Sequence, residues 1–177
     1  MDETERTGSS RADDDDRPPA ERVVDLTDPG ALLDPTDARW LRDTAERAVA
    51  LLGAGGEVRV KVVADAEMAD AHLRYADTPG TTDVLTFDLS ESAGALDTDI
   101  MVCFDEAARR AAERAHDTRR ELLLYIVHGV LHCLGHDDHD EEDFRRMHAA
   151  EDELLERLGV GATFRTGADG LAAGVES

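Results

Sequence analysis

The sequence is poor in basic residues, cysteine and long apolar runs. Only 19 of its 177 residues are Lys or Arg, against 41 Asp and Glu, which gives a formal net charge of -22. A chain this acidic does not hold duplex nucleic acid or anionic lipid by broad electrostatic attraction, so we expect no DNA partner and no membrane partner. No apolar run approaches the ~18 residues of a membrane span, and the first ten residues lack the pattern of a signal peptide. We therefore expect a cytoplasmic protein. The two cysteines, Cys103 and Cys133, are too few for a disulfide framework, which fits a reducing compartment.

The composition divides the chain into one domain and two tails. Residues 1–21 combine acidic runs with two prolines and almost nothing apolar, which predicts a disordered acidic tail. Residues 160–177 are rich in Gly and Ala without periodicity, which predicts a flexible C-terminal tail. Residues 22–159 remain as a single working domain, long enough for one sizeable core.

Hydrophobic periodicity predicts the elements of this domain. Apolar residues alternate with charged ones from Val58 to Val62, which predicts a half-buried strand, and β-rich runs over 84–89 and 100–104 predict two more. Apolar positions spaced for helices predict helical segments over 35–52, 64–75, 105–115, 122–134 and 140–158. In the last helix we expect Phe144 and Met147 to face inward with the later leucines. Strands early and helices late predict an α+β fold, a small single domain with helices packed on one mixed β-sheet.

The most informative segment runs from His128 to His139. His128 and His132 are four residues apart in a strongly apolar helix, so both imidazoles leave the same face one turn apart and can chelate one ion. Gly135 fits the end of that helix. The chain can then turn and bring residues 136–139, here called the hook, back toward the histidine pair. Three neutral nitrogen ligands with an open fourth position are typical of catalytic zinc.

The metal helix is zincin-like, yet it lacks the general base of the zinc peptidases. Their pattern is H-E-x-x-H, and Gly129 stands where that Glu would be. The sequence therefore disfavours a peptidase and assigns no catalytic base or nucleophile. Asp138 and His139 are both chemically acceptable as the third ligand. Asp137 and Asp138 could instead orient an imidazole or cap the final helix.

Three blocks of this sequence resemble the YbeY family of endoribonucleases, also called rRNA maturation factors. The segment from His128 to His139 is similar to the signature H-G-x-L-H-x-x-G-Y-D-H, with His136 in place of Tyr and one extra acidic residue before the last His. Residues 82–87 resemble the P-T-D/N-V-L-S-F block, and residues 99–103 resemble the G-D-I-x-I-C strand. The blocks follow one another in the family order, and the resemblance covers residues 38–158.

The resemblance implies a zinc-dependent, single-strand-specific endoribonuclease that acts in maturation of the small-subunit rRNA end and in ribosome quality control. It implies one zinc ion per chain, held by His128, His132 and His139. The implied partners are single-stranded RNA or rRNA and the ribosome or small-subunit assembly proteins. The alternative function is a non-catalytic, zinc-containing ribosome-assembly factor.

The resemblance also bears on substrate binding. It points to Thr82 and Asp83 as substrate-binding residues. The family usually carries Arg after a Tyr in the preceding loop, whereas here Tyr75 is followed by Ala76, which leaves Arg74 as the nearest substitute. Five further arginines could form an RNA-facing rim or, more simply, a solvated helix with i,i+4 ion pairs; they are Arg109, Arg110, Arg114, Arg119 and Arg120.

Overall fold

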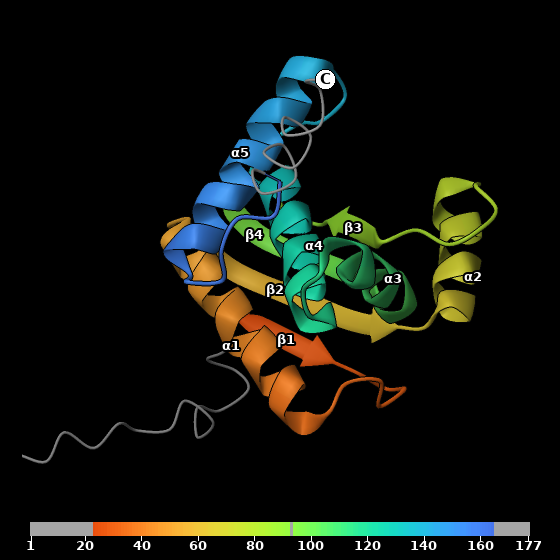
Figure 1. The fold of residues 1–177 in the computed structure, drawn as a ribbon. Helices are drawn as coiled ribbons and strands as arrows, with labels where there is room; N and C mark the ends of the chain where they lie inside the picture. The colour runs from red at the N-terminus through yellow and green to blue at the C-terminus, as the bar shows by residue number, and fades with distance from the viewer. Residues whose placement is uncertain (1–22, 93, 165–177) are drawn as a thin grey trace, which may run out of the picture.

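Four strands form one mixed sheet in the computed structural model, which describes residues 23–92 and 94–164 (Figure 1). The strand order is β1 (Val24–Thr27), β2 (Gly55–Val63), β4 (Ala95–Cys103) and β3 (Val84–Asp88). β1 and β4 both run parallel to β2, and β3 runs antiparallel to β4. The predicted mixed sheet is therefore confirmed.

Each helix that the periodicity predicts is present. The helices are α1 (Pro35–Leu51), α2 (Asp65–Ala76), α3 (Phe104–Arg114), α4 (Thr118–Cys133) and α5 (Glu141–Arg157). Asp34 starts α1, because its side chain accepts from the backbone N–H groups of Thr36 and Asp37 at 2.8 and 2.9 Å. Pro35 occupies the first turn, where its missing N–H leaves no hydrogen bond unmade.

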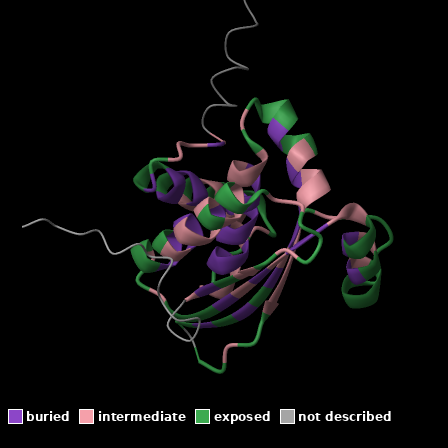
Figure 2. Ribbon diagram, turned by 90° about the horizontal axis from the view of Figure 1, so that it is seen from below, coloured by how far each residue is buried: buried purple, intermediate pink, exposed green. Residues whose placement is uncertain are grey.

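Helices α1, α3, α4 and α5 lie on one side of the sheet, whereas α2 contacts the opposite face at one end, where Met68 packs against Val63 and Cys103 (Figures 1 and 2). Strand alternation explains this arrangement, since Arg59 and Lys61 point to the face opposite α4. On that face Arg59 pairs with Asp97 and Asp99, and Lys61 pairs with Glu67 of α2. The inner face is apolar and includes Val58, Val60, Val62 and Ile100. The prediction of a half-buried strand over 58–62 is confirmed.

The first turn of α5 differs from the prediction. Phe144 is 48% exposed, so the expectation that it faces inward is wrong. α5 begins at the top of Figure 1, beyond the end of the sheet, and its first turn has no layer to pack against. Further along the helix, Met147, Leu154 and Leu155 are buried as predicted.

Residues 160–164 lie against the helices. Arg120 of α4 donates to the carbonyls of Gly161 and Ala162, and Asp152 of α5 accepts from the backbone N–H of Thr163 at 2.6 Å. The predicted tail over 1–21, and residues 165–177 of the second tail, lie outside the described residues.

The state of the two cysteines and the character of the helices relate to the expectations of no disulfide framework and no membrane span. Cys103 is buried and Cys133 is partly buried, and both are free thiols. Within residues 23–92 and 94–164, none of the helices combines the length and the apolar character that a membrane span requires.

Candidate metal centre

Helix α4 lies close against the sheet and carries both helical histidines. At Gly129 the contact is so tight that a Cβ would lie 2.6 Å from Oγ1 of Thr86 and 3.0 Å from Cδ1 of Ile100. The Glu of an H-E-x-x-H motif therefore does not fit here without moving the helix. This contact sets the rotation of α4, so that His128 and His132 project from the partly open side.

Hydrogen bonds fix the orientation of both imidazoles. Nδ1 of His128 lies 2.7 Å from Oε1 of Glu151, and Nδ1 of His132 lies 3.0 Å from the carbonyl oxygen of His136. A carboxylate and a carbonyl only accept, so each Nδ1 carries the proton and each Nε2 presents a lone pair. The two Nε2 atoms are 3.0 Å apart. At this distance either one ring is protonated and donates a hydrogen bond to the other, or a metal ion shared by both nitrogens takes the place of that proton.

A carboxylate completes a set of three donors. Oδ2 of Asp138 lies 3.8 Å from Nε2 of His128 and 3.7 Å from Nε2 of His132. Tetrahedral zinc with bonds of 2.0–2.2 Å places its ligand atoms about 3.3 to 3.6 Å apart. The separations of 3.0, 3.7 and 3.8 Å lie within about 0.3 Å of that range. These three residues form one of the donor groups compact enough to hold a metal ion in the described part of the chain. Two nitrogens and one oxygen suit a borderline divalent cation such as zinc.

The structure does not bring His139 to the histidine pair. Its imidazole pairs through Nδ1 with Oδ1 of Asp137, and its side chain is 85% exposed. The same carboxylate accepts from the backbone N–H groups of Asp138 and His139 at 2.8 and 3.3 Å, so Asp137 organises the turn of the hook. In this arrangement Asp138 faces the pair, while His139 belongs to a second, more exposed donor group with Asp137 and Asp138.

The two ends of the hook are fixed by helix caps. Gly135 adopts a φ of +93°, and the N–H of His136 donates to the carbonyl of Leu131 at 3.0 Å, so Gly135 closes α4 as predicted. At the other end Asp140 caps α5, because it accepts from the backbone N–H groups of Glu142 and Asp143 at 2.9 and 2.8 Å. Asp138 is therefore not needed as a cap and stays directed at the histidines.

Sequence reasoning missed Glu151, which supports the site from α5. Its side chain is 1% exposed, and its second oxygen accepts from Nδ1 of His148 at 2.7 Å. The carboxylate thus holds one imidazole on each oxygen. Such a partner behind a metal-ligating histidine fixes the ring and raises its basicity as a ligand.

A pocket of about 480 Å³ opens beside the histidine pair. His128 and Asp138 line it, and so does Tyr125, one turn before His128 on the same face of α4. Burial and the neighbouring carboxylate of Glu121 raise the pKa of Tyr125, so its hydroxyl stays protonated and acts as a donor.

The predicted substrate-binding residues lie at different distances from this pocket. Asp83 lines it, and the hydroxyl of Thr82 donates to Oδ1 of Asp83 at 3.1 Å. Arg74 is exposed on α2 and is not among the lining residues. In Figure 1, α2 stands at the edge of the sheet, on the far side of α3 from α5. The structure therefore brings Asp83, but not Arg74, to the candidate site.

The arginines of α3 are engaged by acidic side chains. Arg109 and Arg110 both pair with Glu106, at i,i+3 and i,i+4, and Arg114 pairs with the buried Glu121. Arg109 also donates two hydrogen bonds to Asp65, which lower the pKa of that carboxyl to about 2. These contacts match the solvated, ion-paired helix rather than a rim of unpaired charge.

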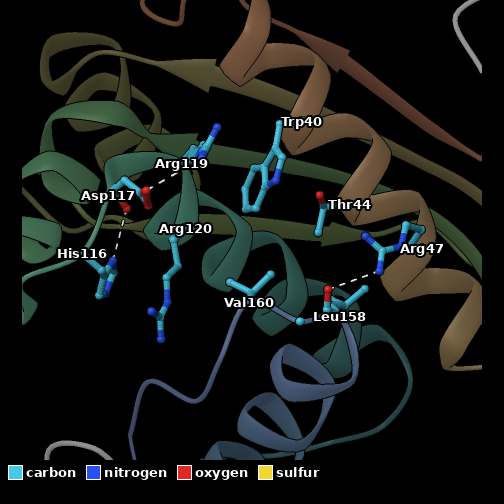
Figure 3. Close-up of a pocket in the computed structure, with 10 residues that line it drawn as sticks. Trp40, Thr44, Arg47, His116, Asp117, Arg119, Arg120, Leu158 and Val160 are labelled. Carbon is cyan, nitrogen blue, oxygen red and sulfur yellow. Dashed lines mark hydrogen bonds and ion pairs between the residues drawn. The ribbon is translucent and has the colours of Figure 1, made fainter.

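Arg119 and Arg120 line a separate pocket of about 380 Å³ at the start of α4 (Figure 3). The guanidinium of Arg119 lies 4.6 Å from the ring centroid of Trp40 and pairs with Asp37 of α1 at 2.9 Å. Arg47 donates to the carbonyl of Leu158 at 3.2 Å. These contacts join α1 and the chain after α5 to the rest of the helical layer, which is a structural role.

Comparisons with known proteins agree with this architecture. A family model described as Endoribonuclease YbeY matches residues 35–159. A Mycobacterium ulcerans protein named Endoribonuclease YbeY is 38% identical over 113 residues, 58% of this chain and 64% of that protein. An Anaeromyxobacter protein of the same name is 38% identical over 144 residues, 79% of this chain and 75% of that protein. The match thus spans less than two thirds of the mycobacterial relative.

A solved structure supports the fold. The solution structure of a Thermotoga maritima protein superposes with a TM-score of 0.55 over 76% of this chain and 90% of that protein, at 24% sequence identity. At this level of identity the likeness extends to the arrangement of helices and strands and no further.

Proposed function

The chain belongs to the YbeY family of endoribonucleases, and on that premise we propose that it is a zinc-dependent endoribonuclease specific for single-stranded RNA. The observation that carries the proposal is the pair of Nε2 atoms facing each other at 3.0 Å with a carboxylate beside them. A proton on one ring can bridge the two nitrogens, and a divalent cation bound by both of them and by the carboxylate satisfies all three donors at once. The pocket that opens next to it gives a substrate access to the same point.

His128, His132 and Asp138 would hold one zinc ion in the arrangement described. His139, which the sequence predicts as the third ligand, is the alternative, because its exposed position in the hook leaves it free to exchange with Asp138. A zinc ion bound here supplies Lewis-acid activation of a water molecule and of a phosphoryl oxygen.

The protein's own groups prepare the site. Glu151 and the carbonyl of His136 hold the two rings with Nε2 directed inward, so that little reorganisation is needed when a cation enters. Gly129 keeps α4 against the sheet and holds the chelate on the pocket side. Asp83 lines the pocket and accepts from the hydroxyl of Thr82, which supports the substrate-binding role that we propose for both residues.

The substrate that best fits the family is rRNA, with processing of the small-subunit rRNA end and ribosome quality control as the role, in the cytoplasm. The acidic surface favours recognition of unstacked bases and of RNA shape over attraction of phosphates. It also favours presentation of the strand by the ribosome or a small-subunit assembly protein.

A second candidate function is a non-catalytic, zinc-containing ribosome-assembly factor. One observation favours it: the arginine that the family usually carries after Tyr75 is absent, and Arg74 does not line the pocket in its place. In this case the metal would organise the hook and the pocket without cleaving RNA.

Incubation with a labelled single-stranded RNA tests both functions. We expect cleavage that a chelator abolishes and added zinc restores, and we expect His128→Ala and His132→Ala to lose both metal and cleavage. The apolar core does not depend on these side chains, so far-ultraviolet circular dichroism of both variants stays close to that of the wild type. Cleavage that persists in metal-free protein would overturn the metal-dependent mechanism. Stoichiometric zinc without cleavage would favour the assembly factor.

A further inference from the structure

One residue that lines the pocket, Tyr125, has a buried hydroxyl without a partner among the described residues. The residue is only 5% exposed. A buried polar group without a partner is destabilising by about 1–3 kcal/mol, so proteins seldom keep one without a reason. Tyr125 precedes His128 by three residues on α4, and both residues line the same pocket. A molecule that meets this hydroxyl therefore lies beside the candidate metal centre.

Aromatic rings form a second wall of the pocket. The rings of Phe144 and His148 meet edge to face at 4.0 Å between centroids, and those of His148 and Phe164 stack at 3.6 Å. Phe144 lines the pocket and keeps 48% of its surface exposed. The three rings come from α5 and from the segment after it. Of the three, Phe144 keeps an exposed ring surface on which another ring can stack.

The charge in the pocket selects against phosphate. Four carboxylates line it, from Asp83, Glu121, Asp138 and Glu151. The two lining guanidiniums already have acidic partners, since Arg114 pairs with Glu121 and Arg110 pairs with Glu106 and Glu113. An anionic group would meet net repulsion in this space, whereas a neutral planar ring would not. The volume of about 480 Å³ lies within the range of small-molecule sites.

We propose that this pocket binds one nucleobase of the RNA substrate, stacked on the exposed ring of Phe144 and accepting a hydrogen bond from the hydroxyl of Tyr125. The inference rests on the proposed function, because it takes RNA as the substrate. Unstacked bases of single-stranded RNA commonly bind proteins by stacking on aromatic side chains and by hydrogen bonds to base edges. The adjoining phosphodiester would then lie toward His128 and Asp138, where the cation that the proposed function assigns to these residues would offset the repulsion by the carboxylates.

Two ligands of equal charge test the proposal directly. One is a tetramer of 2′-O-methyl uridine, and the other is a tetramer of abasic deoxyribose phosphate, which keeps the phosphates and lacks every base. Binding of each to the full chain is followed by NMR chemical-shift titration, which suits weak complexes. We expect the uridine tetramer to bind about tenfold more tightly than the abasic one, since loss of a stacked base weakens binding by about this factor.

Two variants and two controls locate the base. Tyr125→Phe removes only the hydroxyl and should weaken uridine-tetramer binding about two- to tenfold. Phe144→Ala removes an exposed ring, is expected to leave folding intact, and should weaken binding about tenfold. Tyr75→Phe and Leu89→Ala change exposed side chains that do not line this pocket and should leave binding unchanged. Binding of the abasic tetramer should be insensitive to all four substitutions.

The outcomes separate this inference from the proposed function. The base pocket would be overturned if the wild type bound the two tetramers equally well. It would also be overturned if the Tyr125→Phe and Phe144→Ala variants bound the uridine tetramer as tightly as the wild type. Either result would stand even if the protein cleaves RNA. Base-dependent binding that requires Tyr125 and Phe144, in a protein that cleaves no RNA, would support the pocket while the nuclease proposal fails.

Discussion

Glu151 accepts a hydrogen bond from Nδ1 of His128 at 2.7 Å with only 1% of its side chain exposed. A carboxylate this deeply buried is unfavourable unless it is well paired, and His148 occupies its second oxygen. Through this contact α5 fixes the rotation of a ring on α4. The orientation of the candidate metal ligand therefore depends on a helix that supplies no ligand itself.

Glu151→Gln should weaken metal affinity about 10- to 100-fold, because the amide still accepts from His128 but no longer offers a negative charge behind the ring. Competition with a zinc chelator measures this affinity. Glu153→Gln is the matched control, since Glu153 is an exposed residue on the same helix. Thermal unfolding of both variants shows whether the fold is kept. Equal affinity of Glu151→Gln and the wild type would remove Glu151 from the site.

Two alanine substitutions in the hook test which residue is the third metal ligand. Asp138 is the closer residue, with Oδ2 3.7 to 3.8 Å from both imidazole nitrogens. We therefore expect Asp138→Ala to lower bound zinc below one ion per chain, and His139→Ala to retain it. Elemental analysis after dialysis measures the ratio. The reverse result would establish His139 as the ligand and show that the hook rearranges when metal binds.

Gly129→Val should destabilise the protein, because the new side chain points into Thr86 and Ile100. Overpacking of this kind lowers the free energy of unfolding by about 1–3 kcal/mol. Gly55→Val is the control, since a Cβ at Gly55 meets nothing within 4 Å. Urea unfolding of the two variants gives the comparison. Equal stability would mean that α4 can move away from the sheet at low energetic cost.

The elements that the sequence predicts well are those with a long periodic pattern. The helices now labelled α1 and α5 and the alternation around Val60 follow from apolar spacing alone, and all are present. β1 was missed because it has only four residues and two of them are polar. Its position is set by pairing with β2, where Val24 lies opposite Val58, and such a long-range contact leaves no local periodicity.

For the candidate metal centre, too, the sequence predicts the residues that a local spacing relates and misses those that depend on long-range contacts. His128 and His132 could be predicted because one helical turn separates them, whereas the third donor depends on how the hook folds. Glu151 could have been found from its spacing, since it falls on the buried stripe with Met147 and Leu155. A carboxylate on an apolar stripe calls for a partner across the interface. Because α5 carries many other acidic residues, the sequence alone does not distinguish Glu151 from the exposed ones.

RNA binding by the isolated chain should be weak and should depend little on salt. The chain carries a net charge of -22, and the guanidiniums of Arg109, Arg110 and Arg114 already pair with acidic side chains. Few phosphates are then neutralised, and few counterions are released on binding. The slope of log affinity against log salt measures this number, at about -0.7 per phosphate for single strands.

We expect a slope no steeper than about -1.5, which corresponds to roughly two phosphates. Arg74→Ala is informative in the same assay, because Arg74 is exposed on α2 and does not line the pocket. If Arg74 nevertheless contacts the strand, its removal makes the slope shallower by about 0.7 and slows cleavage without loss of zinc. A wild-type slope near -4 would mean about six phosphate contacts and would contradict recognition through bases. In that case the ion pairs of α3 must open when RNA binds, and Arg109→Gln would weaken binding at low salt.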